Sequence, residues 1–179
     1  MSSVPISPIQ TADEQSLASD FRNAMRRIAS SVTLVTSRDA ELRPHGMAAS
    51  AVIPVSMDPP SMLVAANRSS GLHPVVLANR RFCVNVLGEA HHELLAPFSQ
   101  SSRREERFVS GDWQEGPHSL LYLPTAPAAV FCELDQQIDY STHTLLIGRV
   151  IGVRLYDEVI DPLLWFNGAG ARVSRALAA

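Results

Sequence analysis

The residues best suited to bind a ligand through charge lie in one polar loop, Asn67-Arg68-Ser69-Ser70-Gly71. The loop offers two serine hydroxyls and the Arg68 guanidinium, and an apolar helix is expected to begin directly after it, at Leu72. Hydroxyls, a guanidinium and the free amides ahead of a helix are donors that bind phosphate groups. The loop therefore predicts an anion site. Simple N-capping of the helix by Ser69 or Ser70 is the alternative interpretation.

A second segment, Gly46–Ala51, is built mainly of glycine, alanine and serine. Small side chains allow a flat ring or its ribityl chain to lie directly on backbone amides, and Ser50 adds a hydroxyl. A tightly packed sheet is the alternative interpretation. A phosphate site next to a small-residue groove is what a flavin mononucleotide requires, so the two segments together favour such a ligand.

Other catalytic constellations receive little support from the sequence. His91-His92-Glu93 lacks the i, i+4 histidine pair of zinc proteases and is interpreted as a helix start at the surface, so no metal is expected. Gly168-Ala169-Gly170 lacks the third glycine of the dinucleotide fingerprint, and too little chain follows for a βαβ unit. All fifteen basic residues are arginine, which excludes lysine-dependent chemistry. The chemistry is therefore expected to come from an organic cofactor.

Composition limits the partners of this chain of 179 residues. A net charge of −3 and only 6% aromatic residues argue against binding nucleic acid. No apolar run is long enough to span a membrane, and the N-terminus does not resemble a signal peptide. Cys83 and Cys132 lie in apolar runs and are expected to be buried free thiols, which predicts a cytoplasmic location.

We expect residues 1–10 to form a flexible arm and residues 11–179 to form a single domain. An amphipathic helix is predicted after an N-cap at Thr11, with Leu17, Phe21, Met25 and Ile28 along its apolar stripe. The polar stretch Ser99–Trp113 is expected to be a solvated loop or helical turn. Strands are predicted over 32–37, 46–56, 61–66, 82–87, 128–140, 144–155 and 163–166, with short helices over 72–79 and 91–98. Without regular βαβ alternation, this order indicates a closed β-barrel with helical covers.

In order and spacing, a set of motifs between about Phe21 and Gly168 resembles the flavin reductase-like family, whose fold is the FMN-binding split barrel. The resemblance implies a mainly β fold: a six- to seven-stranded Greek-key split β-barrel with flanking short α-helices. The motifs are Ser31–Thr36, Gly46–Ala51, Ser56–Pro60, Asn67–Ser70, Arg81–Leu87, Arg107-Phe108, His143–Val150 and Pro162–Gly168.

The resemblance also implies which residues contact the ligands. The segment from Pro44 to Ala51 resembles the part of the family that holds the isoalloxazine and ribityl groups. Phe98 resembles an aromatic residue near the far end of the flavin, and His143 the histidine near the nicotinamide. The expected cofactor-binding residues are Pro44, His45, Gly46, Met47, Ala48, Ser50, Ala51, Ala65, Ala66, Asn67, Arg68, Ser70, Gly71, Leu72, Phe98 and His143.

The function implied by the resemblance is that of an NAD(P)H:flavin oxidoreductase. Such an enzyme transfers hydride from NADH or NADPH to FMN or FAD and supplies the reduced flavin to a partner flavin-dependent monooxygenase. A homodimer with the flavin near the subunit interface is also implied. The sequence leaves open which flavin and which nicotinamide are used.

Three departures from the family pattern keep other functions open. Ser141-Thr142 stand where the family has Gly-Asp, and Asn167–Gly170 where it has Arg-Gly-x-Tyr. Pro97 stands where an arginine can occur. A non-catalytic flavin-binding or electron-carrier protein of the same fold is therefore the alternative. An oxidase of the pyridoxamine-phosphate type fits the motifs less well.

Overall fold

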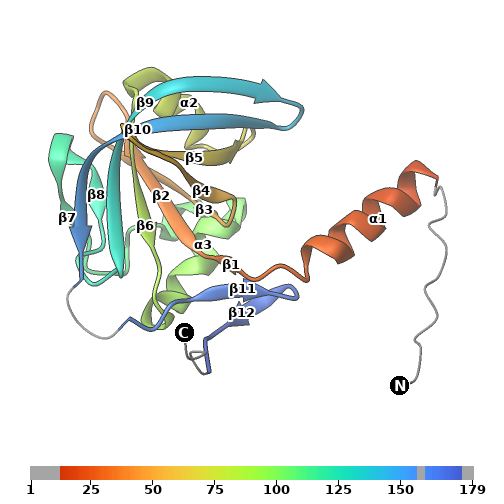
Figure 1. Cartoon of the computed structure of the whole chain (residues 1–179). Helices are drawn as coiled ribbons and strands as arrows, with labels where there is room; N and C mark the ends of the chain where they lie inside the picture. The colour runs from red at the N-terminus through yellow and green to blue at the C-terminus, as the bar shows by residue number, and fades with distance from the viewer. Residues whose placement is uncertain (1–12, 157–159, 175–179) are drawn as a thin grey trace.

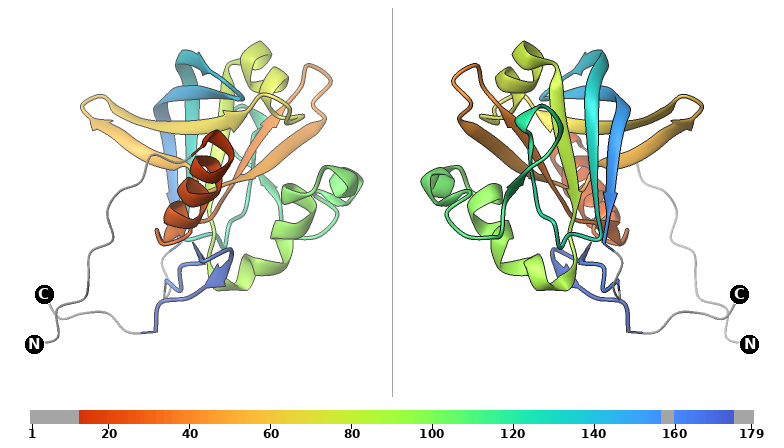
Figure 2. Two further views of the ribbon diagram at one scale, coloured as in Figure 1. Left: turned by 90° about the vertical axis from the view of Figure 1, so that its right-hand side faces the viewer. Right: turned by 90° about the vertical axis from the view of Figure 1, so that its left-hand side faces the viewer.

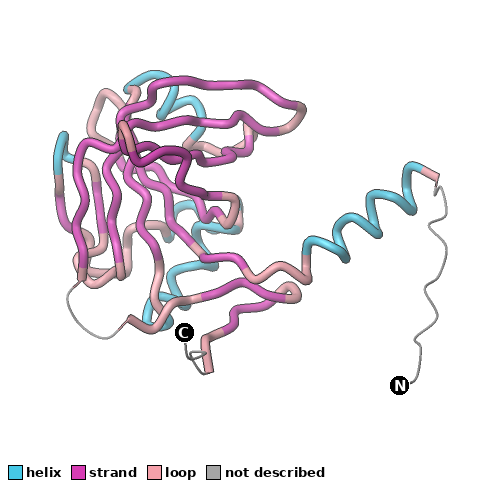
Figure 3. The backbone as a smooth tube through the Cα atoms, viewed as in Figure 1, coloured by secondary structure: helices cyan, strands magenta, loops and turns pink. Residues whose placement is uncertain are grey.

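The computed structural model of the chain describes residues 13–156 and 160–174. The predicted N-terminal arm (1–10) and Thr11 lie outside the described residues. Figure 1 shows a curved β-sheet body with short helices around it, and the first helix extending away from that body. The tube view in Figure 3 shows how much of the body is strand. The extent of a single domain over 11–179 stays a prediction.

Seven antiparallel strands form the main sheet, in the order β3-β2-β6-β9-β10-β5-β4. Two shorter sheets, β1-β11-β12 and β7-β8, lie beside it. The strands of the main sheet are β2 (Thr33–Arg38), β3 (Pro44–Ala49), β4 (Val52–Met57), β5 (Pro60–Asn67), β6 (Arg81–Val86), β9 (Ala128–Tyr140) and β10 (His143–Leu155). The short elements are β1 (Ser30–Ser31), α2 (His73–Asn79), the 3-10 helix η1 (Glu89–Leu94), α3 (Leu95–Ser99), η2 (Ser101–Glu106), β7 (Gln114–Glu115), η3 (Pro117–Ser119), β8 (Leu121–Tyr122), β11 (Leu164–Phe166) and β12 (Ala169–Ala171).

The prediction of one strand over 46–56 is wrong, because the chain breaks at Ser50-Ala51 into two strands. β3 pairs with β2 at one edge of the main sheet, whereas β4 pairs with β5 at the other edge. The turn therefore carries the chain across the open side of the curled sheet. The Ala65 amide donates to the Ala51 carbonyl at 3.0 Å, which extends the pairing of β4 with β5 by one residue and fixes the end of the turn on β5.

β2 is buried on both faces, which explains why its sequence lacks polar alternation. Val35 points into a core enclosed by the sheet and α2, with Phe82 and Leu146 among its members. Leu34, on the opposite face of β2, packs under α3 with Phe98 in a second core. Cys83 and Cys132 are buried and free, as expected. Burial raises the pKa of the Cys132 thiol to about 12, so it is protonated at neutral pH.

The C-terminal strands form a hairpin. β11 pairs with β12 and with β1, and the turn uses Asn167 and Gly168 at positive φ. The predicted strand over 163–166 thus belongs to the small sheet rather than to the barrel. The glycine-rich segment that resembled a dinucleotide fingerprint is this turn and strand, and no βαβ unit follows within the described residues.

Helix α1 (Glu14–Met25) is capped by Asp13, whose carboxylate accepts from the Ser16 amide at 2.8 Å. The predicted N-cap at Thr11 is therefore wrong, since Asp13 satisfies the free amide closer to the helix start. The apolar stripe is present but uncovered: Leu17 is 60% exposed and Phe21 63%. Figure 1 shows α1 extending away from the barrel, and the two views of Figure 2 look along the direction in which it extends. None of the helices in 13–156 and 160–174 combines the length and apolarity that membrane crossing requires.

Candidate functional site

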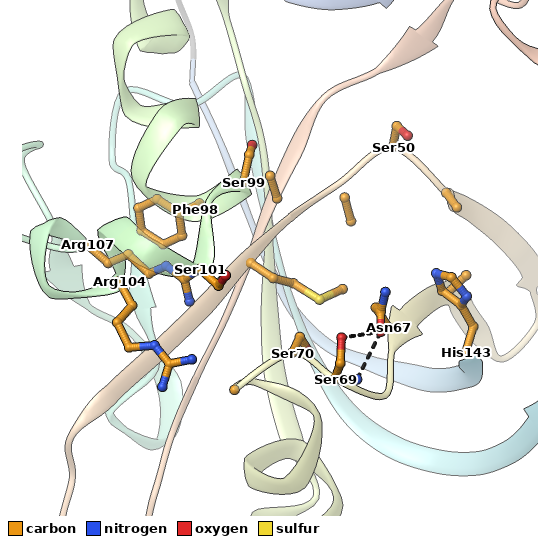
Figure 4. Close-up of a pocket in the computed structure, with 16 residues that line it drawn as sticks. Ser50, Asn67, Ser69, Ser70, Phe98, Ser99, Ser101, Arg104, Arg107 and His143 are labelled. Carbon is orange, nitrogen blue, oxygen red and sulfur yellow. Dashed lines mark hydrogen bonds between the residues drawn. The ribbon is translucent and has the colours of Figure 1, made fainter. Parts of the chain in front are cut away.

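A cavity of about 490 Å³ opens where the β3–β4 turn, the end of β5, the start of β10 and α3 meet. Figure 4 shows side chains from all of these elements converging on it. Two predicted ligand-binding segments, far apart in sequence, thus lie on one cavity. Its lining residues are Met47, Ala48, Ala49, Ser50, Ala51, Ala65, Asn67, Ser69, Ser70, Gly71, Phe98, Ser99, Ser101, Arg104, Arg107 and His143.

One wall is backbone covered only by small side chains. Ala48, Ala49, Ser50 and Ala51 continue from β3 into the turn, and Ala65 lies on β5. β3 is an edge strand, so the amides on the side away from β2 have no ladder partner in the main sheet. A flat group can therefore approach polar backbone here without displacing side chains. The wall matches the groove that the small residues predict.

Gly46 serves a different purpose from the one predicted, since it does not line the cavity. A Cβ at this position would lie 2.6 Å from Cε1 of Phe98 and 3.1 Å from Cζ of Phe108. Phe98 and Phe108 pack edge to face at 5.1 Å between ring centroids, and Trp113 completes the cluster. The glycine lets this cluster lie directly on β3. Phe98 can then form the end of the cavity.

Arg107 fastens the same helical segment to β3. Its Nε donates to the Pro97 carbonyl and its Nη1 to the Gly46 carbonyl, both at 2.8 Å. Burial lowers the pKa of this guanidinium, and the nearby charge of Arg104 lowers it further. Arg107 remains cationic, since a free guanidinium titrates far above neutral pH. Its charge therefore stays at the edge of the cavity even though two of its donors are committed.

Arg104 contributes a second cation that has no competing partner. It lies exposed on η2 and lines the cavity, and its guanidinium makes no hydrogen bond or ion pair with any residue of the described ranges. In Figure 4 its guanidinium extends toward the Ser69–Ser70 side of the cavity. The sequence interpretation missed both arginines, because Ser99–Trp113 was expected to be a solvated stretch. The Arg107-Phe108 motif was the one signal that pointed to them.

The polar loop after β5 is internally organised. Asn67 Oδ1 accepts from the Ser69 amide at 2.9 Å and from its hydroxyl at 2.8 Å. Ser70 Oγ accepts from the His73 amide at 3.2 Å, the first amide of α2, whereas the N-cap position itself is Leu72 rather than either serine. Arg68 does not line the cavity, and its guanidinium reaches the Ser141 carbonyl at 3.4 Å. Among the predicted loop donors, Ser70 lines the cavity and Arg68 does not.

A partly buried chain of hydrogen bonds holds this loop against the β9–β10 hairpin. His73 Nε2 lies 2.9 Å from Thr144 Oγ1, and the Thr144 hydroxyl donates to Asp139 at 2.6 Å. His143 directly precedes Thr144 on β10 and pairs with Asn67 at the end of β5. Its side chain is half-buried and lines the cavity. Its Nδ1 lies 2.9 Å from Thr142 Oγ1. Thr142, one of the two departures before the histidine, is thus the group that orients the imidazole.

The remaining predicted residues are distributed around the cavity. Pro44 and His45 line a second cavity next to it, and Ala66 and Leu72 are buried in the core. The predicted residues that line the first cavity are Met47, Ala48, Ser50, Ala51, Ala65, Asn67, Ser70, Gly71, Phe98 and His143. The lining residues that lie outside both predicted segments and the expected list are Ser99, Ser101, Arg104 and Arg107. Ala49 and Ser69 also line the cavity; they belong to the two predicted segments but not to the list of expected cofactor-binding residues.

His91 is not a surface residue, so the interpretation of His91-His92-Glu93 as an exposed helix start is wrong for its first member. His91 is buried, its Nδ1 accepts from the Gly88 amide at 3.1 Å, and its Nε2 lies 3.1 Å from Thr125 Oγ1. Burial lowers its pKa, which favours the neutral imidazole. Its two hydrogen bonds therefore fix the start of η1 against the segment that contains Thr125. The described residues contain no group of three or more His, Cys, Asp or Glu placed to hold a metal ion.

Comparison with known proteins places this geometry in a family. The model of the family described as "Flavin reductase like domain" matches residues 25–174. The chain belongs to the flavin reductase-like family. Its seven-stranded sheet is therefore the split barrel of that family, and the prediction of a mainly β split barrel with short flanking helices is confirmed.

Individual relatives in the flavin reductase-like family match most of the chain. The reductase component of FADH(2)-dependent resorcinol hydroxylase from Rhizobium sp. (strain MTP-10005) is 39% identical over 163 residues, covering 90% of each protein. FMN reductase (NADH) RutF from Cronobacter sakazakii is 35% identical over 155 residues, 87% of this chain and 92% of that protein. The solved structure of the styrene monooxygenase flavin reductase from Pseudomonas putida S12 superposes with a TM-score of 0.80 at 26% identity, covering 88% of this chain and 99% of that one.

The contact between Gly46 and Phe98 predicts a position-specific cost. Gly46→Ala is expected to lower the free energy of unfolding by about 1–3 kcal/mol, because the added methyl forces Phe98 and Phe108 off β3. Chemical denaturation followed by tryptophan fluorescence measures this. Gly71→Ala is the control, since a Cβ there meets nothing within 4 Å. Equal stability of both variants would contradict the packing role of Gly46.

Proposed function

We propose that this chain is an NAD(P)H:flavin oxidoreductase that transfers hydride to FMN or FAD and supplies the reduced flavin to a partner flavin-dependent monooxygenase. The observation that carries the proposal is the cavity itself, with a wall of small residues, a serine loop and the unpaired guanidinium of Arg104. The names of the relatives support it, since two of them are reductase components of oxygenase systems and a third is an FMN reductase that uses NADH.

Each part of the cavity has a task in this reaction. The wall from Ala48 to Ala51 receives the isoalloxazine ring, and the free amides of β3 donate to its polar edge, which favours the negative charge that reduction places there. Ser69, Ser70 and Arg104 hold the phosphate end. When bound, the flavin supplies the hydride acceptor. Phe98 closes one end of the cavity and limits how far the ring can slide.

His143 lies on the opposite side of the cavity from Phe98, at the start of β10 (Figure 4). We propose that its imidazole hydrogen-bonds the nicotinamide coenzyme and sets the coenzyme ring over the flavin wall. Nδ1 lies beside the Thr142 hydroxyl, which leaves Nε2 for the coenzyme. Ring stacking within about 3–3.5 Å is the main requirement for hydride transfer, so a positioning group affects rate without taking part in bond making.

We further propose that the chain works as a homodimer in which a second copy covers α1. The exposed stripe ends at Met25 and Ile28, which with Trp165 line a hollow beside the barrel. Ser50 and Ala51 line both this hollow and the ligand cavity. A partner subunit seated here would bury the apolar stripe and form part of the mouth of the cavity. Contiguous exposed apolar surface of this kind favours such an interface.

The reaction is tested by steady-state oxidation of the coenzyme. The purified protein is expected to oxidise NADH or NADPH only when FMN or FAD is present, because the flavin is the hydride acceptor in the proposed reaction. Absorbance of the reduced coenzyme at increasing flavin concentration measures this. Flavin binding without oxidation of either coenzyme would replace the reductase by the alternative, a non-catalytic flavin-binding or electron-carrier protein.

The role of His143 predicts a selective effect on the coenzyme. His143→Ala is expected to raise the KM for NADH or to slow hydride transfer, while the flavin Kd changes by less than about twofold, since no phosphate or ring donor is removed. Stopped-flow reduction at varied NADH concentration separates the two parameters. The control is His118→Ala, which alters a histidine that does not line the cavity. Unchanged reduction kinetics in His143→Ala would make it a structural turn residue.

The dimer predicts that a charge on the stripe changes the oligomeric state. Phe21→Asp is expected to shift the protein from dimer to monomer, because a carboxylate cannot be buried unpaired in an apolar interface. Sedimentation velocity measures the mass of each species. Val109→Asp is the control, since Val109 is 79% exposed and does not line the hollow beside α1. A wild-type protein that sediments as a monomer would refute the dimer.

A further inference from the structure

A second cavity, of about 530 Å³, adjoins the first at its phosphate end. The two share Gly71, Arg104 and Arg107. The residues that line only the second cavity are Arg43, Pro44, His45, Glu105 and Phe108. The proposed function uses the first cavity alone, so the second is a surface that the proposed reaction leaves unexplained.

The shared residues mark the joint between the cavities, and this joint is cationic. The Arg104 guanidinium has no hydrogen bond or ion pair with the described residues, and Arg107 lines the same joint with its own charge. Burial is the larger cause of the lowered pKa of Arg107, and the like charge of Arg104 lowers this pKa further. A pyrophosphate at the joint would relieve this repulsion, because each of its two phosphates carries a negative charge.

The far wall of the second cavity is held in a fixed arrangement by Asp39. This carboxylate accepts from Arg43 Nε at 2.8 Å and lies 3.1 Å from His45 Nε2. Burial acts to raise the pKa of Asp39, but the hydrogen bonds from His45 and Arg43 outweigh it and bring the pKa to about 2. These hydrogen bonds hold the Arg43 guanidinium and the His45 imidazole in place at the cavity. The Phe108 ring and Pro44 line the same cavity.

This set of groups suits a purine nucleoside. A guanidinium and an imidazole offer flat faces on which a base can stack, and Phe108 and Pro44 supply apolar contact. Glu105 is an acceptor with no hydrogen bond to the described residues, suited to ribose hydroxyls or an exocyclic amine. Both cavity volumes fall within the range of about 300–1,000 Å³ that is usual for small-molecule sites.

We infer that the two cavities together bind one FAD molecule, with the riboflavin part in the first, the adenosine part in the second and the pyrophosphate at Arg104. The inference rests on the proposed function and adds to it a preference for FAD over FMN. NADH also carries an adenylate group, and the experiment below separates the two sources of that group.

The test compares the Kd of riboflavin, FMN and FAD by titration of flavin fluorescence. In the wild-type protein FAD is expected to bind at least about tenfold more tightly than FMN, since it alone fills the second cavity. The double variant Arg43→Ala/Glu105→Ala removes two opposite charges that line only that cavity, so its net charge is unchanged. This variant is expected to raise the Kd of FAD about tenfold and that of FMN by less than about twofold.

Two further variants keep the result interpretable. Arg103→Ala/Glu106→Ala removes an ion pair from the same 3-10 helix that lines neither cavity, and is expected to leave every Kd unchanged. Arg104→Ala is expected to weaken FMN and FAD but not riboflavin, because only the first two carry phosphate. A far-ultraviolet spectrum identical to that of the wild type shows that each variant is folded.

Three outcomes would overturn the inference. Equal Kd values for FMN and FAD in the wild type would show that the second cavity receives no adenosine from flavin. A double variant that keeps the FAD Kd but raises the KM for NADH would assign the second cavity to the coenzyme. Absence of binding by any of the three flavins would refute the proposed function as well, and only that outcome does so.

Discussion

Arg107 donates to the carbonyls of Pro97 and Gly46, and the Phe98 ring packs directly on Gly46. This contact joins an edge strand of the barrel to the short helical segment α3–η2, and the rest of the site depends on it. Hydrogen bonds from a charged donor contribute about 1.5–3 kcal/mol each, enough to fix a segment that has few other polar ties. With η2 held here, Phe98 forms the end of the first cavity and Arg104 the joint to the second.

The electrostatics of the molecule follow from the same contact. The chain carries a net charge of −3, yet the cations at the two cavities are concentrated on one helical turn and one hairpin. Arg43 is neutralised by Asp39 and Glu41, whereas Arg104 is not paired with any described residue. A local positive field on a weakly acidic protein attracts phosphorylated ligands.

Sequence reasoning could predict the parts of the site that are contiguous in the chain. The serine loop and the small-residue segment stand out by composition, and both lie on the first cavity. It could not predict which strand edge they share, because the break at Ser50-Ala51 depends on the curl of the whole sheet and not on local propensity. Arg104 was missed because a charged residue in a polar stretch has the same signature whether it faces solvent or a cavity. Arg68 was included because its guanidinium is a phosphate donor in a loop of hydroxyls, but the side chain turns to Ser141.

Ser50 and Ala51 connect three properties of the molecule. They end β3 so that the chain can reach the opposite edge of the sheet, they form the floor of the ligand cavity, and they line the hollow beside α1. A side chain larger than serine here would fill the cavity and the hollow at once. Two proposed partners therefore require small residues at these positions. The flat ligand requires them on the side of the cavity, and the second subunit requires them on the side of the hollow. A site whose mouth is shared with a subunit interface can change its opening through a small movement of that subunit, which suits an enzyme that must release its reduced flavin to another protein.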